Sequence, residues 1–462
     1  MARVQESGDE ESSHEIRIVR LGHCVCVLAL AGSLAGAVDA APPVGRQTRF
    51  SFAPYLDPNL PNHTLGIGKV VIDGRRVQIE GGDSARPTGP FLFEWGDGET
   101  TESGFTASHT YARAERDYVV KVTARYRDGK DTVTARVRFV PRQYTCQRRE
   151  AVPRRVFIPQ EETALGSTMP GYTAPEGVTC FRHAELRSVP REVIEYVLDV
   201  GHDIQMDLCN RDVTKEAATR QVVLKQTCSG GCGSLWFADP VALVCHPDYL
   251  SGEIGFSSLL HELAHNLTLN SPAGYRFGGK TDGPMNAIVS ETLAQIFQHA
   301  TIHEILNSEG RYGLSEDLCQ ALQESGVQSI EVVRGAYRRY LADPRRCTTY
   351  NDPNTPEDET FNTFMTVAYT FCSLAEERAD YRAPLKRMMR LMQTFCAADR
   401  ERFQQRENES FRSTFLVAAM SYGFDQDLRE KFRKLSFPVS DELYAEFLAR
   451  MSGSMASSAP TP

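Results

Sequence analysis

The chain has 462 residues, which is enough for two or three domains with substantial hydrophobic cores. Apolar residues make up 41% of it and charged residues 24%, as in ordinary globular proteins, which excludes a chain that is disordered throughout. The formal net charge of −9 gives no indication of nucleic-acid binding, and we expect no nucleic-acid partner.

The N-terminus has the pattern of an export signal. Arg17 and Arg20 precede an apolar run over residues 24–34, and residues 38–40 read Val-Asp-Ala, which suits cleavage. The run is too short for a typical membrane span. We therefore predict a signal peptide over residues 1–40 and a secreted protein, extracellular or periplasmic, with no membrane span once the signal is removed. A retained N-terminal anchor is the alternative.

Residues 48–142 carry the pattern of an antiparallel β-sandwich. Short, β-branched and partly alternating runs are separated by turns that contain glycine and aspartate. The sequence Gly-Asp-Gly at 96–98 predicts a tight turn, and Trp95 before it is expected to anchor a core. The predicted strands include residues 69–72, 91–95, 118–122 and 133–140.

Three segments of this module resemble the PKD domain. They are Phe-Glu-Trp-Gly-Asp-Gly-Glu at 93–99, His-Thr-Tyr at 109–111 and Tyr-Val-Val-Lys-Val at 118–122. The resemblance implies an immunoglobulin-like fold and often a role in holding matrix, glycan or protein, and it implies no catalysis. A plain spacer is the alternative. We expect the module to fold alone and to be dispensable for chemistry.

A charged linker is predicted over residues 143–158, after the sandwich. It holds arginine pairs at 148–149 and 154–155, which a processing protease could cut, although an exposed hinge is the simpler interpretation. Residues 159–283 have a mixed α+β pattern. Within them we expect a helix over 190–200 and strands over 222–224 and 241–245.

The most informative segment is His-Glu-Leu-Ala-His at residues 261–265, inside an apolar run. Two histidines four residues apart on a helix project from one face, one turn apart, and so can bind one metal ion. Zinc is the ion most often bound by this pattern. His261 and His265 are therefore predicted zinc ligands. Glu262 lies beside the ion, where it can take a proton from water as a general base.

A second helix is predicted just downstream, over residues 286–297, and it carries Glu291. A catalytic zinc has three protein ligands and one open position, so Glu291 would complete the set. The two helices together, His-Glu-x-x-His and then Ala-Ile-x-x-Glu-x-x-x-x-Ile-Phe, resemble the gluzincin metallopeptidases, including the thermolysin-like ones. The resemblance covers about forty residues. It implies that His261, His265 and Glu291 bind zinc and that Glu262 is the general base.

The chain differs from that family at the position that usually orients a ligand histidine, and a second residue competes for the role of third ligand. Thermolysin-like enzymes usually have an aspartate four residues after the ligand glutamate, where it orients a ligand histidine. Gln295 stands there in this chain, and its amide oxygen can accept from an imidazole N–H without adding negative charge. The aspzincins take their third ligand from an aspartate in a Gly-Thr-x-Asp context, which makes Asp282, after Thr281, a rival of Glu291. We favour Glu291.

Other polar residues near the motif are weaker candidates. Tyr275, in the loop after the metal helix, and His299 are candidates for stabilising an oxyanion. His303 lies four residues after His299, and both are predicted to be structural or surface residues. In metallopeptidases of this kind the strand before the metal helix commonly pairs with an extended substrate, so the predicted strand at 241–245 is expected to offer an edge.

The region from 284 to 452 has mostly helical periodicity, and residues 453–462 are predicted to be a disordered tail. The helical segments are 284–307, 328–342, 359–378, 384–396, 411–421 and 439–451. Ten of the 12 cysteines lie outside the predicted signal, and an even number in an exported chain predicts disulfides.

The sequence as a whole predicts a multidomain protein: an all-β immunoglobulin-like sandwich, then an α+β zincin-like metallopeptidase domain with a mostly helical C-terminal part. The predicted function is a secreted zinc metallopeptidase that acts on a peptide or protein substrate. The alternative is a PKD-bearing extracellular adhesin or binding protein whose metal site is not catalytic. A structural zinc would normally be closed by four protein ligands, and Glu262 would have no role there.

Overall fold

The structure is a computed structural model. It describes residues 49–59, 65–83, 87–127, 129–139, 142–167, 173, 175–181, 189–210, 221–227, 231–250, 255–269, 287–344, 346, 357–404 and 409–457. The predicted signal peptide and two of the candidate site residues, Tyr275 and Asp282, lie outside these ranges. None of the described helices combines the length and the apolar composition that a membrane crossing requires.

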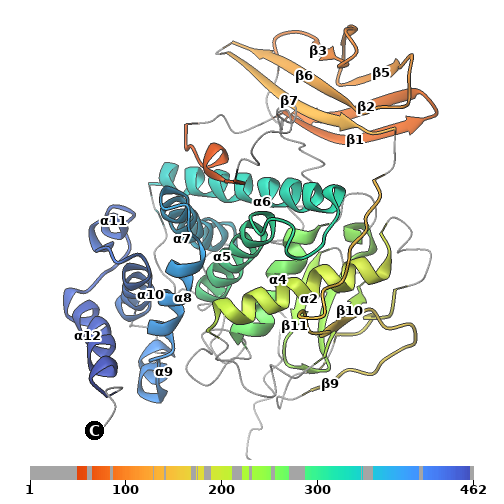
Figure 1. Ribbon diagram of the computed structural model, residues 1–462. Coiled ribbons are helices and arrows are strands. Elements are labelled where there is room, and N and C mark those ends of the chain that lie inside the picture. The colour runs from red at the N-terminus through yellow and green to blue at the C-terminus, as the bar shows by residue number, and fades with distance from the viewer. Residues whose placement is uncertain are drawn as a thin grey trace, which may run out of the picture.

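The N-terminal part is β-rich, with two antiparallel sheets that enclose one core (Figure 1). This confirms the predicted antiparallel β-rich region. The first sheet has the order β1-β2-β5, with bounds Leu65–Asp73, Arg76–Asp83 and Thr106–Thr110. The second has the order β4-β3-β6-β7, with bounds Thr100–Ser103, Phe91–Glu94, Tyr118–Tyr126 and Gly129–Val137.

The turn at residues 96–98 is built around Trp95, which is fully buried. The indole Nε1–H donates to Thr101 Oγ1 at 2.9 Å, and the Tyr111 hydroxyl donates to the Trp95 carbonyl at 2.8 Å. Gly96 has a φ of +80°, and a Cβ there would lie 2.5 Å from the Val119 carbonyl oxygen, so only glycine fits. The segment thus forms the tight, core-anchored turn that its residues predict.

Residues 49–56 do not belong to the β-rich part, although they precede it in the chain. Phe52 is fully buried among the C-terminal helices. The Glu376 carboxylate accepts from the Ser51 hydroxyl at 2.6 Å and from the Phe52 N–H at 2.9 Å. A short helix, η1 (Ala53–Tyr55), follows. The predicted module of residues 48–142 therefore includes an N-terminal segment that packs among the C-terminal helices and not against the β-sheets.

A third sheet is mixed and has the order β11-β13-β10-β8. Its strands are Cys232–Leu235, Val241–Cys245, Val222–Gln226 and Val156–Phe157. β10 is parallel to β13 and β8, whereas β11 is antiparallel to β13 and forms an edge. The expectation that residues 241–245 offer an edge is therefore wrong, because β11 covers that side. Two further short strands, β9 (Gly166–Ser167) and β12 (Ala238–Asp239), pair with each other.

The predicted linker over 143–158 is docked onto the helical body and is not a free hinge. Its end forms β8, and Asp199 of α2 (Arg191–Leu208) holds it there. One Asp199 oxygen accepts from the N–H groups of Arg155 and Val156, each at 2.7 Å, and the other pairs with Arg148 at 2.5 Å. The buried carboxylate needs these partners because burial of an unpaired charge is costly.

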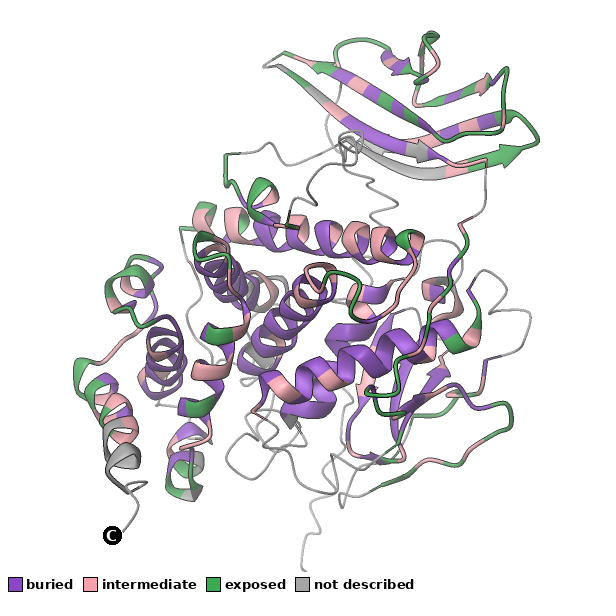
Figure 2. Ribbon diagram, in the orientation of Figure 1, coloured by how far each residue is buried: buried purple, intermediate pink, exposed green. Residues whose placement is uncertain are grey.

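The remainder is mostly helical, as predicted, and it surrounds a large core. Figure 2 shows that the central helices are buried over most of their length. The helices after α2 are α4 (Phe256–Leu269), α5 (Ala287–Leu306), α6 (Glu316–Ala342), α7 (Glu357–Glu377), α8 (Arg382–Met392), α9 (Ala397–Gln404), α10 (Glu409–Phe424), α11 (Arg429–Lys434) and α12 (Asp441–Ser457), with η3 (Pro247–Leu250) before α4.

Several helix boundaries differ from the predicted ones; α2, for example, continues to Leu208, eight residues past the predicted end. Helix α6 begins at Glu316, twelve residues before the predicted start, and it includes Gly326. A Cβ at Gly326 would lie 3.1 Å from the Phe52 ring, so the glycine makes room for a tertiary contact and does not end the helix. Helix α12 continues to Ser457, and the predicted disordered tail therefore includes one more helical turn.

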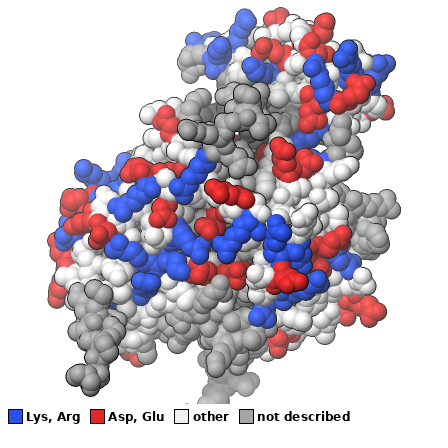
Figure 3. Space-filling model, in the orientation of Figure 1, with Lys and Arg blue, Asp and Glu red and all other residues white. Residues whose placement is uncertain are grey.

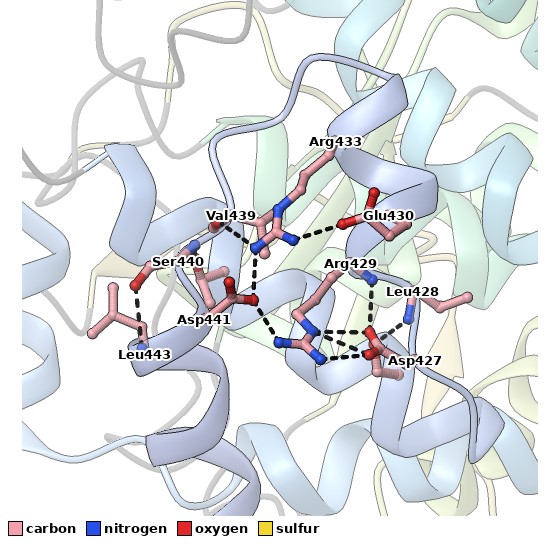
Figure 4. Close-up of polar contacts among 11 residues, drawn as sticks. Asp427, Leu428, Arg429, Glu430, Arg433, Val439, Ser440, Asp441 and Leu443 are labelled. Carbon is pink, nitrogen blue, oxygen red and sulfur yellow. Dashed lines mark hydrogen bonds and ion pairs between the residues drawn. The ribbon is translucent and has the colours of Figure 1, made fainter.

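Charged side chains of both signs are interspersed on the face drawn in Figure 3. One exposed cluster joins α11 to α12 (Figure 4). Asp441, at the start of α12, pairs with Arg429 at 2.5 Å and with Arg433 at 2.6 Å, and Arg429 also binds Asp427. The carboxylates are more than half exposed, so each pair contributes little to stability.

Candidate metal centre

Helix α4 carries both motif histidines and is fixed by its neighbours. Gly201 of α2 lies against it: a Cβ there would fall 2.4 Å from Leu260 Cδ2, so the two helices approach closely. The Gln205 side-chain Nε2 donates to the Leu260 carbonyl at 2.9 Å. The apolar face of α4 is fully buried, and its residues are Leu259, Leu260, Leu263, Ala264 and Leu267. Packing thus sets the rotation of α4 and directs the histidines toward α5.

The two histidines and Glu291 of α5 come together. Glu291 Oε2 lies 3.0 Å from His261 Nε2, and Oε1 lies 3.3 Å from His265 Nε2. The ligand atoms of the three residues lie within 4.8 Å of one another, and this is the only such group of three or more potential ligands among the described residues. All three positions predicted for metal binding therefore share one site, despite the distance of α5 from α4 along the chain.

The donor set fits a zinc ion. Two ligand atoms about 2.1 Å from one tetrahedral ion are about 3.4 Å apart. The distances of 3.0 and 3.3 Å between the Glu291 oxygens and the imidazole nitrogens are close to this value. Both histidines direct Nε2 at the site, so the proton of a neutral imidazole would sit on Nδ1. His265 Nδ1 is buried and has no hydrogen-bond partner among the described residues.

The electrostatics of Glu291 favour its ionised form. Burial alone would raise the pKa of this carboxyl, but the charges of His265 and His261 and their hydrogen bonds lower it well below its usual range. A carboxylate that stays ionised is a suitable ligand for a cation, because metal ligands must be deprotonated to bind.

Glu262 has a different environment on the same helix. Its side chain is 6% exposed, and burial raises its pKa to about 7. His261 and a hydrogen bond from the Ser234 backbone N–H oppose this rise, whereas repulsion from Glu291 adds to it. The two carboxyl groups thus have pKa values displaced in opposite directions, which is typical of sites where one carboxylate is a ligand and the other moves protons.

Ser234 belongs to the edge strand β11, and the register explains how its N–H reaches Glu262. The His246 N–H donates to the Gly231 carbonyl at 2.9 Å, so residues 231 and 246 are a hydrogen-bonded pair. The pairing then alternates along the ladder, and Ser234, opposite Leu243, directs its N–H away from β13. This donor was missed in the sequence because Cys-Gly-Ser-Leu is short and lacks a clear alternation of apolar residues.

The supporting residues proposed from the sequence lie elsewhere. The Gln295 amide donates to Ser329 Oγ on α6 at 2.9 Å, and no bond from it to His261 or His265 occurs among the described contacts. His299 is fully buried, donates from Nδ1 to the Gln295 carbonyl at 2.8 Å and packs edge-on against a phenylalanine ring. Burial lowers the pKa of His299 to about 4, so it is a neutral core residue.

His303 is likewise structural. It is buried, its ring centroid lies 4.6 Å from that of Tyr381, and burial lowers its pKa to about 4. Glu304, next to it, pairs with Arg382 of α8 at 2.9 Å. The structure therefore gives no support for a role of this helical turn in the metal centre.

Comparison of the chain with models of protein families, with curated proteins and with solved structures found no match.

Proposed function

We propose that this protein is a secreted zinc-dependent peptidase. The convergence of His261, His265 and Glu291, with Glu262 beside them, is the observation that carries the proposal. The set provides three ligands, which is the number that leaves an open position on a catalytic zinc, whereas a structural zinc is normally closed by four. A zinc ion bound there would supply a Lewis acid that polarises a carbonyl group and acidifies water.

Glu262 is the residue that moves the proton. With a pKa of about 7 its carboxylate can accept a proton from the attacking water at neutral pH and deliver it to the leaving amine. The Ser234 N–H holds this carboxylate at the outer edge of β11. Proton donation to the amine is needed because an amide anion is too basic to leave.

The edge of β11 is a suitable place for an extended peptide. Cys232 and Ser234 both occupy positions whose backbone groups face away from β13, since they alternate with the hydrogen-bonded pairs. A peptide added as a further strand would bind through its backbone regardless of sequence, which favours a peptide or protein substrate over a small molecule.

The finer fold assignments belong to the same proposal. The helix pair that carries the ligands and the mixed sheet with an antiparallel edge support a zincin-like catalytic domain. The two sheets around Trp95 support an immunoglobulin-like, PKD-type module, which would hold matrix, glycan or protein.

The test combines metal analysis with peptide hydrolysis by the full chain purified after export. We expect about one zinc per chain, hydrolysis of an unstructured protein such as casein, and loss of hydrolysis on chelation. Glu262→Gln should retain zinc and fold but lose about 10²–10⁴-fold in kcat, because an amide cannot take the proton. A zinc-loaded wild-type protein with no hydrolysis of a peptide library would overturn the proposal in favour of a non-catalytic metal site.

A further inference from the structure

Two buried cysteines lie directly opposite each other on neighbouring strands, close to Glu262. Cys232 of the edge strand β11 is the register partner of Cys245 in β13, and the exposed fractions of the two side chains are 8% and 0%. The thiols are joined by a hydrogen bond, and Cys232 is close enough to Glu262 to interact with its charge. Both cysteine side chains lie on the face of the sheet that packs against the helices, since both belong to the large core that the helices surround.

The register also places this pair where a disulfide can form without movement of the backbone. Residues 231 and 246 are hydrogen-bonded, so 232 and 245 form a non-hydrogen-bonded pair, whose Cα atoms are about 4.5 Å apart in antiparallel sheets. Disulfides need Cα atoms about 4.4–6.8 Å apart and facing Cβ atoms. Of the other six described cysteines, none is paired in strand register with another cysteine.

We propose that Cys232 and Cys245 form a disulfide when the protein matures in an oxidising compartment, and that this bond fastens the edge strand beside Glu262. The oxidant is a small disulfide such as glutathione disulfide. A thiolate of one cysteine attacks it and releases one reduced glutathione, leaving a mixed disulfide. The second thiolate attacks this bond, closes Cys232–Cys245 and releases the second glutathione. The cysteines lose two electrons and two protons, which the glutathione takes up.

The consequence concerns the position of Ser234, two residues after Cys232 on the same strand. An edge strand is held to its sheet from one side only, and β11 is short. A covalent bond to the buried strand β13 would restrain the Ser234 N–H that meets the Glu262 carboxylate. The disulfide itself does not depend on hydrolysis, so its presence and the proposed enzymatic function can be tested separately.

Disulfide mapping of the full-length chain tests the bond directly. The protein is matured with glutathione disulfide and denatured at acidic pH, where thiolates are scarce and exchange is slow. It is then alkylated without reduction, digested and analysed by mass spectrometry. We expect a peptide that links Cys232 to Cys245 and disappears on reduction. Alkylation of both thiols, or a bond from Cys232 to any cysteine other than Cys245, would overturn the proposal.

Amide hydrogen exchange tests whether the disulfide restrains strand β11. We expect the amides of β11 to exchange faster in Cys232→Ala, in Cys245→Ala and in the double variant, by the same factor in all three, because each removes the same bond. Cys372→Ala, a buried thiol on α7, is the matched control and should leave β11 unchanged. Effects of the two single variants that add up in the double variant would indicate separate packing contributions and contradict the bond.

Discussion

Replacement of Phe52 by alanine tests the finding that the N-terminal segment is part of the helical body. The ring is fully buried and packs against His299 at 5.3 Å and against Phe50 at 4.8 Å between ring centroids. The cavity has little freedom to collapse, because Gly326 and the fixed helices around it line the same space. Loss of a buried phenylalanine in such a site costs about 3–5 kcal/mol of the free energy of unfolding.

The assay is denaturant unfolding followed by two signals. Helical circular dichroism reports the C-terminal body, and fluorescence of Trp95, in a Trp236→Phe background, reports the β-rich part. Phe52→Ala should shift only the helical transition, since Trp95 belongs to a separate core. Phe50→Ala, at a half-buried neighbouring position, is the control and should cost less.

A decrease of less than about 1 kcal/mol in the free energy of unfolding of Phe52→Ala would refute the reasoning, because removal of a fully buried ring costs more than that. An equal shift of the Trp95 transition would show that the segment belongs to the β-rich part after all. If the prediction holds, a truncated chain that begins near Arg155 lacks Phe52, and the helical part that contains the metal centre is destabilised. The dispensability of the β-rich part is better tested by removing residues 65–139 and retaining 49–59.

The remaining predictions concern single carboxylates. Glu291→Ala should lose zinc, whereas Asp282→Ala should retain it; metal loss confined to the Asp282 variant would reverse the ligand assignment. Burial alone would raise the pKa of Asp399, but hydrogen bonds from Arg450 lower it. The ion pair therefore stabilises the fold above the unfolded-state pKa of about 3.9 and is lost as pH falls through the folded-state value. The difference in unfolding free energy between wild type and Asp399→Asn should shrink below about pH 4; a constant difference would contradict this.

Local periodicity was sufficient to predict much of the architecture. Residues 118–126 alternate between buried and exposed in β6, as their β-branched pattern indicates. The spacing of His261 and His265 determines that both lie on one face of a helix wherever that helix packs. Both features depend on residues a few positions apart, so the sequence alone specifies them. Glu291 was predicted from its place on a downstream apolar helix and from the resemblance of the helix pair to the gluzincins, whereas its contact with His261, 30 residues away, is a tertiary one.

Contacts between distant segments were decided only in the tertiary structure. The Phe52 backbone N–H donates to the Glu376 carboxylate, which lies more than 300 residues away in the chain, and no local pattern predicts that the two residues are partners. The antiparallel strand β11 covers β13 and so replaces it as the edge beside Glu262. Its four residues have too little apolar surface to be recognised as a strand, and they become one by pairing with β13. Side-chain complementarity across such distances follows from the packing of the whole core, which is why residue spacing could not predict it.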